Sequence, residues 1–297
     1  MKAQHISFFL LAGLVTFNAC RKDGSAGLTK PDVTRIVDTL PHEPGLPAPN
    51  LPASQNRISN YRLSSIDYNS DPGGTAYYHY NGDGTTRQVQ YSARHSGTTN
   101  VDYTYDNNAL SEIMAEHSEY KTKYTYEKGW ISTISHVSSI SNRGYKFLFT
   151  YNTNGTVARM KYYNINEAGD VLIYTNTYTY DTNGLVKKIT AVANNSTSVI
   201  LSINSYSSEC DFNPLTFSGI TLGDQYELFN QPVMSQLKRL PARITKTFLN
   251  NAGAVTSEVG IDYNYTITGT RLDKVVTSIR YPANPQSNSS SEMVFHY

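Results

Sequence analysis

The 297-residue chain has few charged residues, two cysteines, one tryptophan and no long apolar segment. Only 16% of its residues are charged, and 25 Lys and Arg against 24 Asp and Glu leave a formal charge of +1. Phosphate binding needs a clustered basic excess, so this balance argues against a nucleic-acid partner. The apolar run from Ile6 to Val15 is shorter than the roughly 20 residues of a membrane-spanning helix. We therefore expect no transmembrane helix.

Motifs of common enzymes are also missing. The chain has no glycine-rich phosphate loop, nucleophile elbow, HExxH zinc motif or CxxC pair. The seven histidines are scattered singly. His79, His117 and His136 fall in expected strands and could meet across a sheet, but solvated or cross-strand histidines are commoner than an unsignalled metal site. We predict no metal, no cofactor and no catalytic residue.

Two acidic features have simple structural explanations. The run Asn81-Gly82-Asp83-Gly84 lacks the bidentate glutamate of an EF-hand loop and sits where a turn is expected. Glu112, Glu116 and Glu119 form the nearest approach to a carboxylate cluster, and charge on a strand edge discourages edge-to-edge pairing. We therefore expect a protein that is not an enzyme, and an enzyme with an unrecognised site is the least favoured alternative.

The N-terminus has the layout of an export signal, with Lys2, an apolar run and small residues before Cys20. The tetrad Phe17-Asn18-Ala19-Cys20 resembles a bacterial lipobox. The resemblance implies that residues 1–19 are a lipoprotein signal peptide and that Cys20 is the lipidated first residue of the mature chain. The alternative is an ordinary secretory signal with an incidental cysteine. If Cys20 is acylated, Cys210 has no disulfide partner and is expected to be a buried thiol.

The residues after Cys20 indicate a location and a tether. Arg21 rather than Asp follows the cysteine, which by resemblance to Gram-negative lipoproteins implies outer-membrane export. Arg21-Lys22-Asp23 partly resembles the surface-export signal of Bacteroidota lipoproteins, which favours the cell surface over the periplasmic face. Six prolines lie between residues 24 and 54, so residues 20–56 form an extended lipidated tether and residues 57–297 the folded domain.

One aromatic-x-Tyr phrase recurs through the folded part, and 24 tyrosines make the chain rich in this residue. The copies are Tyr78-His79-Tyr80, Tyr103-Thr104-Tyr105, Tyr124-Thr125-Tyr126, Phe149-Thr150-Tyr151, Tyr178-Thr179-Tyr180 and Tyr263-Asn264-Tyr265. Turns such as Asp181-Thr182-Asn183-Gly184 and apolar pairs such as Val186 and Ile189 follow. Residues two apart on a strand share a face, so each repeat is predicted to be a β-hairpin with both aromatic rings on one side.

The phrase resembles tyrosine-aspartate (YD, Rhs-like) repeats, carried by Tyr105-Asp106, Tyr180-Asp181 and the turn glycines Gly155 and Gly184. With the lipobox and the tether, the chain resembles uncharacterised Bacteroidota surface lipoproteins. We predict an all-β antiparallel meander of about fourteen to sixteen strands, curled into a large open sheet. A closed outer-membrane barrel is disfavoured, because a lipid anchor makes one unnecessary and the strands lack a clear lipid-facing apolar set.

One insertion, from about residue 210 to 240, interrupts the repeats. Tyr226, Phe229, Val233, Leu237 and Leu240 recur at three- and four-residue spacing, and Pro232 is expected to begin a short helix that ends before Pro241. This insertion is predicted to pack across a sheet face. A lid over a binding site is the alternative.

These features favour an outer-membrane lipoprotein acting as a non-enzymatic structural or interaction module. The tyrosines are expected mainly to form cross-strand ladders. Alternatively, some of them form with Trp130 a stacking platform for sugar rings, and the protein is a glycan-binding lipoprotein that assists polysaccharide capture. The expected partners are the membrane, through the lipid, and a glycan or a surface protein.

Overall fold

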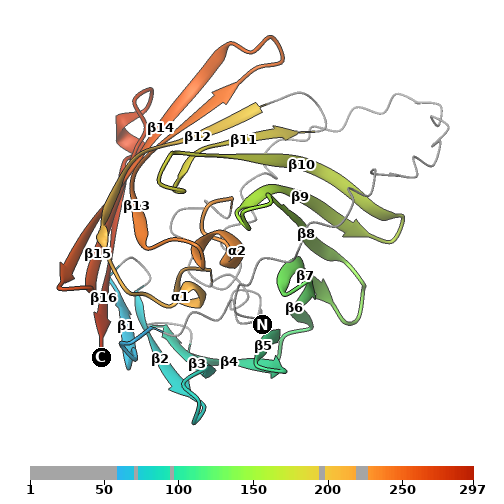
Figure 1. Cartoon of the computed structure of the whole chain (residues 1–297), viewed down its shortest axis with the longest axis vertical. Helices are drawn as coiled ribbons and strands as arrows, with labels where there is room; N and C mark the ends of the chain where they lie inside the picture. Colours follow the sequence, from blue (N-terminus) through green and yellow to red (C-terminus); the bar gives the residue numbers. More distant parts are fainter. Residues whose placement is uncertain (1–58, 70–72, 94–96, 194–197, 219–226) are drawn as a thin grey trace, which may run out of the picture.

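The computed structural model describes residues 59–69, 73–93, 97–193, 198–218 and 227–297. Sixteen antiparallel strands follow one another around a closed barrel (Figure 1). The strands are β1 (Ser65–Tyr68), β2 (Gly74–Tyr80), β3 (Thr86–Ala93), β4 (Gly97–Asp106), β5 (Ala109–Ala115), β6 (Tyr120–Glu127), β7 (Trp130–Ser138), β8 (Gly144–Tyr151), β9 (Val157–Asn166), β10 (Gly169–Tyr180), β11 (Val186–Ala193), β12 (Ser198–Glu209), β13 (Arg239–Leu249), β14 (Val255–Thr268), β15 (Arg271–Arg280) and β16 (Ser289–His296). The helical segments are α1 (Pro214–Ser218), α2 (Gln231–Met234) and the 3-10 turn η2 (Pro285–Ser287).

The predicted open sheet is wrong, because the first and last strands pair. Ser65 lies opposite His296 and Tyr68 opposite Met293, while the other side of β1 pairs with β2. Closure removes the exposed sheet edges that an open meander leaves at both ends. The repeats specify each hairpin, but closure depends on the four-residue strand β1, which carries no copy of the aromatic phrase.

A β-bulge explains the apolar pairs that follow each turn. In a regular strand, residues three apart point to opposite faces. Tyr178 lies opposite Ile189 and Tyr180 opposite Val186, so one extra residue, Lys187, is accommodated on β11. Val186 and Ile189 are consequently both buried inside the barrel.

The strands from β2 to β11 show the same register shift at every aromatic-x-Tyr copy. The shifts lie at His79/Tyr80, Thr104/Tyr105, Thr125/Tyr126, Thr150/Tyr151 and Thr179/Tyr180. The three-residue spacing of the apolar pairs, such as Val186 and Ile189, is therefore a signature of the bulge. It does not indicate a helix.

The described residues between β12 and β13, which include α1 and α2, lie inside the ring of strands (Figure 1). Several of their apolar side chains are fully or almost fully buried in the main core. They are Leu228, Phe229, Val233, Met234 and Leu237, followed by Leu240 on β13. They pack in the same cluster as Ile131, Met160 and Ile189 from the barrel wall. Burial of this apolar surface stabilises the barrel from within.

Local sequence accounts for both short helices. The Asn230 side chain caps α2 by accepting a 3.0 Å hydrogen bond from the Val233 amide. Pro232, which was expected to begin the helix, is its second residue, after Gln231. The helix ends at Met234, well before Pro241. The other short helix, α1, begins at Pro214, and Asn213 Oδ1 accepts a hydrogen bond from the Leu215 amide at 3.0 Å.

Among the residues that the structure describes, no helix is long and apolar enough to cross a membrane.

Candidate functional site: the tyrosine rim

The tyrosines that end the repeats lie at one end of the barrel, where the even-numbered strands finish; we call this end the tyrosine rim. Each hydroxyl contacts the backbone near the start of the preceding odd-numbered strand. Six donate to carbonyl oxygens at 2.5–2.8 Å: Tyr126 to Leu110, Tyr151 to Ile131, Tyr180 to Val157, Tyr206 to Val186, Tyr265 to Pro241 and Tyr297 to Leu272. Tyr80 and Tyr105 bond in the same way to the backbone of Leu63 and Thr86.

Each of these contacts, which we call tyrosine clasps, joins the two ends of a β-hairpin. Burial raises the pKa of Tyr80 and of Tyr126 to about 12, so both hydroxyls keep the proton that they donate near neutral pH. Two of the clasps escaped the sequence analysis. Phe295-His296-Tyr297 is a seventh aromatic-x-Tyr copy at the end of the chain, whereas Tyr206 has Asn204 in place of the first aromatic residue.

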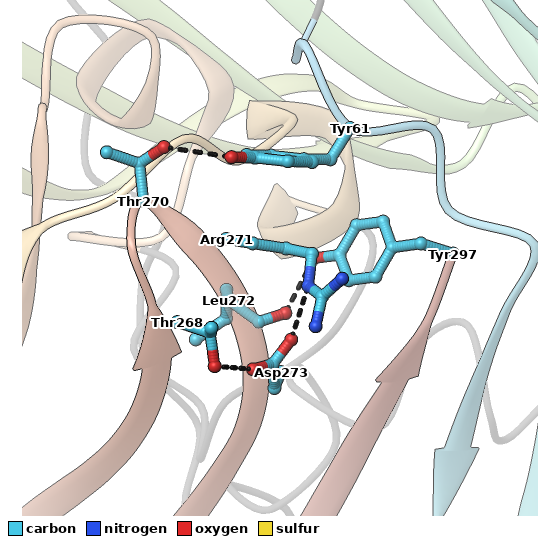
Figure 2. Close-up of polar contacts among 7 residues, drawn as sticks. All are labelled: Tyr61, Thr268, Thr270, Arg271, Leu272, Asp273 and Tyr297. Carbon is cyan, nitrogen blue, oxygen red and sulfur yellow. Dashed lines mark hydrogen bonds and ion pairs between the residues drawn. The ribbon is translucent and has the colours of Figure 1, made fainter.

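A polar cluster lies at the seam where the barrel closes and is formed by Tyr61, Thr270, Arg271, Asp273 and Tyr297 (Figure 2). We call it the seam cluster. The Arg271 guanidinium lies 5.3 Å from the centre of the Tyr297 ring, and its Nε donates a 2.6 Å hydrogen bond to Asp273 Oδ1. The Tyr61 and Tyr297 rings meet edge to face with centroids 5.8 Å apart. The Tyr61 hydroxyl contacts Thr270 Oγ1 at 3.3 Å.

Electrostatics keep the seam cluster neutral as a whole. The hydrogen bond from Arg271, followed by one from Thr268, lowers the pKa of Asp273. The hydrogen bond and charge of Asp273 raise the pKa of Arg271. The pair therefore remains ionised over the physiological range, and its two charges cancel.

Three chain segments position the seam cluster. The Asn60 amide donates to Asp211 Oδ2 at 2.7 Å, and the Asp211 amide donates to the Thr270 carbonyl at 2.7 Å. Asp211 thus ties the strand-entry segment and the start of the insertion to the turn between β14 and β15. Asp211 lies about 150 residues after Asn60 and about 60 residues before Thr270. The spacing of motifs in the sequence does not predict contacts between segments so far apart.

A shallow pocket opens beside the seam cluster, with about 220 Å³ of empty space counted out to its solvent-exposed mouth. Its lining residues come from the same three segments and from β16. They are Ser59, Tyr61, Leu63, Phe212, Asn213, Thr216, Leu272, Phe295 and Tyr297. The Thr216 hydroxyl is buried on this wall without a hydrogen-bond partner. The pocket therefore combines aromatic walls with an unused polar group.

A second aromatic feature lines the inner face of β6 to β10. Ring centroids are 5.2 Å apart for Tyr120–His136, 5.0 Å for His136–Tyr145, 6.1 Å for Tyr145–Tyr162 and 4.9 Å for Tyr162–Tyr174. His136 Nδ1 contacts Thr122 Oγ1 at 2.9 Å, and burial lowers the pKa of His136 to about 4. This inner ladder is the cross-strand arrangement expected from the sequence, and several of its ring faces are covered by neighbouring rings.

The histidines singled out in the sequence are not brought together. His79 is exposed on β2, His117 lies in the turn after β5, and His136 belongs to the inner ladder. In the described ranges no group of three His, Cys, Asp or Glu side chains could hold a metal ion.

The remaining residues from the sequence analysis have structural roles or lie elsewhere. Glu112 pairs with Lys121 at 3.2 Å, and Glu116 accepts from Asn100 at 2.8 Å. Trp130 packs against Tyr151 with centroids 5.0 Å apart. Cys210 is a buried free thiol. Residues 1–56, including Cys20, lie outside the described part of the chain.

The outer wall of the barrel carries cross-strand ion pairs. Asp262 on β14 pairs with Arg243 on β13 at 2.8 Å and with Arg280 on β15. Lys274 and Glu292 pair at 2.5 Å between β15 and β16. Asp262 alternates along its strand with the buried residues Ile261 and Tyr263, so the charged side chains point away from the core.

No family model and no curated protein matches this chain. Solved structures share its fold. A porin-like protein from Bacteroides vulgatus is 13% identical with a TM-score of 0.53, over 79% of this chain and 98% of its own. A porin-like protein from Bacteroides uniformis is 14% identical with a TM-score of 0.53, over 80% of this chain and 98% of its own. The chain thus shares the closed β-barrel fold of these two proteins.

Proposed function

We propose that this chain is a lipid-tethered outer-membrane protein whose barrel stands beside the bilayer and acts as a non-enzymatic structural or interaction module. The observation that carries the proposal is the polarity of the barrel wall. A membrane-spanning barrel has an apolar outer band about 25 Å tall and a polar interior. Here the apolar side chains fill the interior and ion pairs such as Arg243–Asp262 cover the outside.

The energetic cost of inserting this barrel wall into a lipid bilayer is large. A single Arg or Lys on the lipid face costs about 2–4 kcal/mol near the bilayer midplane. Arg243, Arg280 and Lys274 all belong to neighbouring strands β13 to β15. An acyl chain contributes about 0.8 kcal/mol for each buried methylene, and two or more chains hold a protein stably. The lipobox at Cys20 therefore supplies the membrane attachment that the barrel wall does not favour.

Labelling with radioactive palmitate tests the anchor. Cells expressing the full chain should incorporate label, and the Cys20→Ala variant should not. Cys210→Ala is the matched control, because this second cysteine is buried in the barrel and should leave labelling unchanged. Label on the Cys20→Ala variant contradicts the proposed anchor. Protease accessibility on intact cells then tests the proposed cell-surface location against the periplasmic face.

A second candidate function is glycan binding that assists polysaccharide capture. It is favoured by the seam cluster, where an exposed aromatic ring, Tyr297, stands beside the Arg271–Asp273 pair and a small pocket. Aromatic faces flanked by hydrogen-bonding side chains suit sugar rings. If no polysaccharide retards the protein in an affinity gel, glycan binding is contradicted. The proposal of a structural or interaction module would still stand.

A further inference from the structure

We propose that the outer face of β9 to β11 is a docking surface for the anionic headgroups of the membrane to which the chain is tethered. Four cations define this surface, which we call the basic face: Arg159, Lys161, Lys187 and Lys188. The inference rests on the proposed tether and adds an orientation to it, with β9 to β11 turned toward the bilayer. The chain as a whole carries a formal charge of only +1, so the fold gathers these positive charges in one place.

Strand register places the basic face on the outside of three neighbouring strands (Figure 1). On β9, Arg159 and Lys161 flank the buried Met160, and on β11 Lys188 precedes the buried Ile189. Because side chains alternate along a strand, these cations point away from the core. Their direct partners on β10 are all threonines: Thr175, Thr177 and Thr179.

Neighbouring acids do not cancel the charge of the basic face. Arg159, Lys187 and Lys188 are exposed, and within the described part of the chain no Asp or Glu side chain lies within ion-pair distance of them. Elsewhere on the outer wall the pattern differs, since Arg243 on β13 pairs with Asp262 at 2.8 Å. The basic face therefore presents a local positive potential that attracts anions.

The acids at the two ends of β10 have other partners. Asp170, near the start of the strand, pairs with Lys146 on β8. Asp181, just after the end of the strand, accepts hydrogen bonds from the amides of Asn183 and Leu185 at 2.8 and 2.9 Å. Neither of these two acids forms an ion pair with the basic face.

Exposed aliphatic side chains border the basic face at the end away from the tyrosine rim. Val192 on β11 is 48% exposed and lies opposite Thr175, which in turn lies opposite Lys161. Val171, near the start of β10, is 45% exposed. Cations beside aliphatic side chains suit the boundary between lipid headgroups and acyl chains. A lipid surface is favoured as the occupant because it offers partners to both kinds of side chain.

The expected strength of this contact fits an orienting role. Each Lys or Arg near an anionic membrane surface strengthens binding by about fivefold, and four together by on the order of several hundredfold. Such a contact is too weak to keep a free protein on the membrane. A tether raises the effective concentration of the barrel at the surface, so the same contact can orient a protein that the lipid already holds there.

Vesicle flotation at low salt tests the basic face separately from the anchor. The protein is the mature chain from residue 20 with Cys20→Ala, which carries neither signal peptide nor lipid. The probes are phosphatidylcholine vesicles with and without phosphatidylglycerol. The chain should bind the anionic vesicles about tenfold more strongly than the neutral ones, and added salt should weaken this binding. Replacing Arg159, Lys187 and Lys188 together by Gln should weaken it by about tenfold or more.

The matched control removes one Arg and two Lys from ion pairs elsewhere on the outer wall, with Arg243→Gln, Lys274→Gln and Lys121→Gln combined. It should lose little binding, and circular dichroism checks that both triple variants are folded. Equal losses in the two variants would show that net charge governs binding, which overturns the basic face as a docking surface.

The outcomes also separate the basic face from the anchor. Equal binding to neutral and anionic vesicles overturns the docking proposal. Binding to neither composition also overturns it, and an acidic protein then becomes the better occupant of this surface. Both results leave the proposed lipid on Cys20 standing, because the protein used here carries no lipid. Loss of the anchor is decided by the palmitate labelling alone.

Discussion

Tyr180 ends strand β10, and its hydroxyl donates a 2.8 Å hydrogen bond to the carbonyl of Val157 at the start of β9. The same contact recurs around the rim in the other tyrosine clasps. A tyrosine at this position therefore contributes twice, through the apolar surface of its ring inside the barrel and through a hydroxyl that satisfies a carbonyl at the barrel end. This double use explains why the second aromatic position of the phrase is tyrosine in every copy, while the first is sometimes phenylalanine, as at Phe149.

Removing one clasp hydroxyl should therefore destabilise the barrel measurably. Tyr180→Phe keeps the ring and is expected to lower the free energy of unfolding by about 1 kcal/mol, the usual net contribution of one hydrogen bond. Urea unfolding followed by circular dichroism measures the change. Tyr77→Phe is the control, because Tyr77 is among the exposed apolar side chains of the described chain. Equal unfolding midpoints for the two variants would show that the clasp is not stabilising.

His136 gives the barrel a dependence on pH. Burial lowers its folded-state pKa to about 4 from an ordinary value of 6.5, so the unfolded chain binds a proton over a range where the folded chain does not. Stability should be full above pH 6.5 and fall as the pH drops toward 4, by on the order of 1–3 kcal/mol.

Unfolding midpoints measured at several pH values between 4 and 7 check this expectation for His136. The variant His136→Phe keeps a ring between Tyr120 and Tyr145 and should show a flatter pH profile. Parallel profiles for wild type and variant contradict a protonation event at His136, because the carboxylates that titrate in the same range are common to both proteins.

Among the elements, β10 shows how the wall meets the insertion. The Tyr178 hydroxyl donates to the carbonyl of Glu227 at 2.6 Å, just before α2. Asn176 lies two residues earlier on the same inner face, is fully buried, and neither atom of its amide has a hydrogen-bond partner. Most contacts of the insertion are apolar, so this amide is a local cost rather than the basis of the packing.

Replacing that amide by an apolar group of similar size should help folding. Asn176→Leu is expected to leave stability unchanged or to raise it by about 1–3 kcal/mol, because it removes two unsatisfied polar atoms. Thermal or urea unfolding measures the effect. The control is Asn204→Leu, which removes an exposed side chain whose Nδ2 donates to Thr245 Oγ1 at 2.8 Å, and it should be neutral or slightly destabilising. A large loss for Asn176→Leu would contradict this account of the interface.

The sequence predicts the individual β-hairpins better than the way in which they assemble into a closed barrel. The aromatic-x-Tyr spacing places both rings on one face, and turns such as 181–184 use Gly184 at a φ of 76°, as its position after Asn183 suggests. Both are consequences of local geometry. Closure was missed because it depends on how far successive hairpins twist and shift, and on whether β1 reaches β16.

The seam cluster was missed for a related reason. Tyr61, Arg271 and Tyr297 come from distant parts of the chain and meet only because the barrel closes. The one available signal was Phe295-His296-Tyr297, a copy of the repeated phrase that places a clasp tyrosine at the last strand. Arg271 and Asp273 stand in an ordinary polar strand start and carry no motif.

At the scale of the whole molecule, fold and surface indicate different relations to a membrane. The backbone matches porin-like barrels with a TM-score of 0.53, whereas the side chains place the apolar set inside and the ion pairs outside. Backbone topology fixes the closed shape, but the alternation of side chains decides which face meets water. On our proposal, the barrel is a water-exposed body held to the outer membrane by the lipid on Cys20.

The most direct test of this claim is carbonate extraction of membranes from cells that express the full chain or its Cys20→Ala variant. We expect wild type to stay with the membranes, and Cys20→Ala to appear in the extract and in the detergent-free soluble fraction with the circular dichroism of a folded β-protein. Cys210→Ala should behave as wild type. Retention of folded Cys20→Ala protein in carbonate-washed membranes would contradict the account, because only a barrel embedded in the bilayer would then explain the attachment.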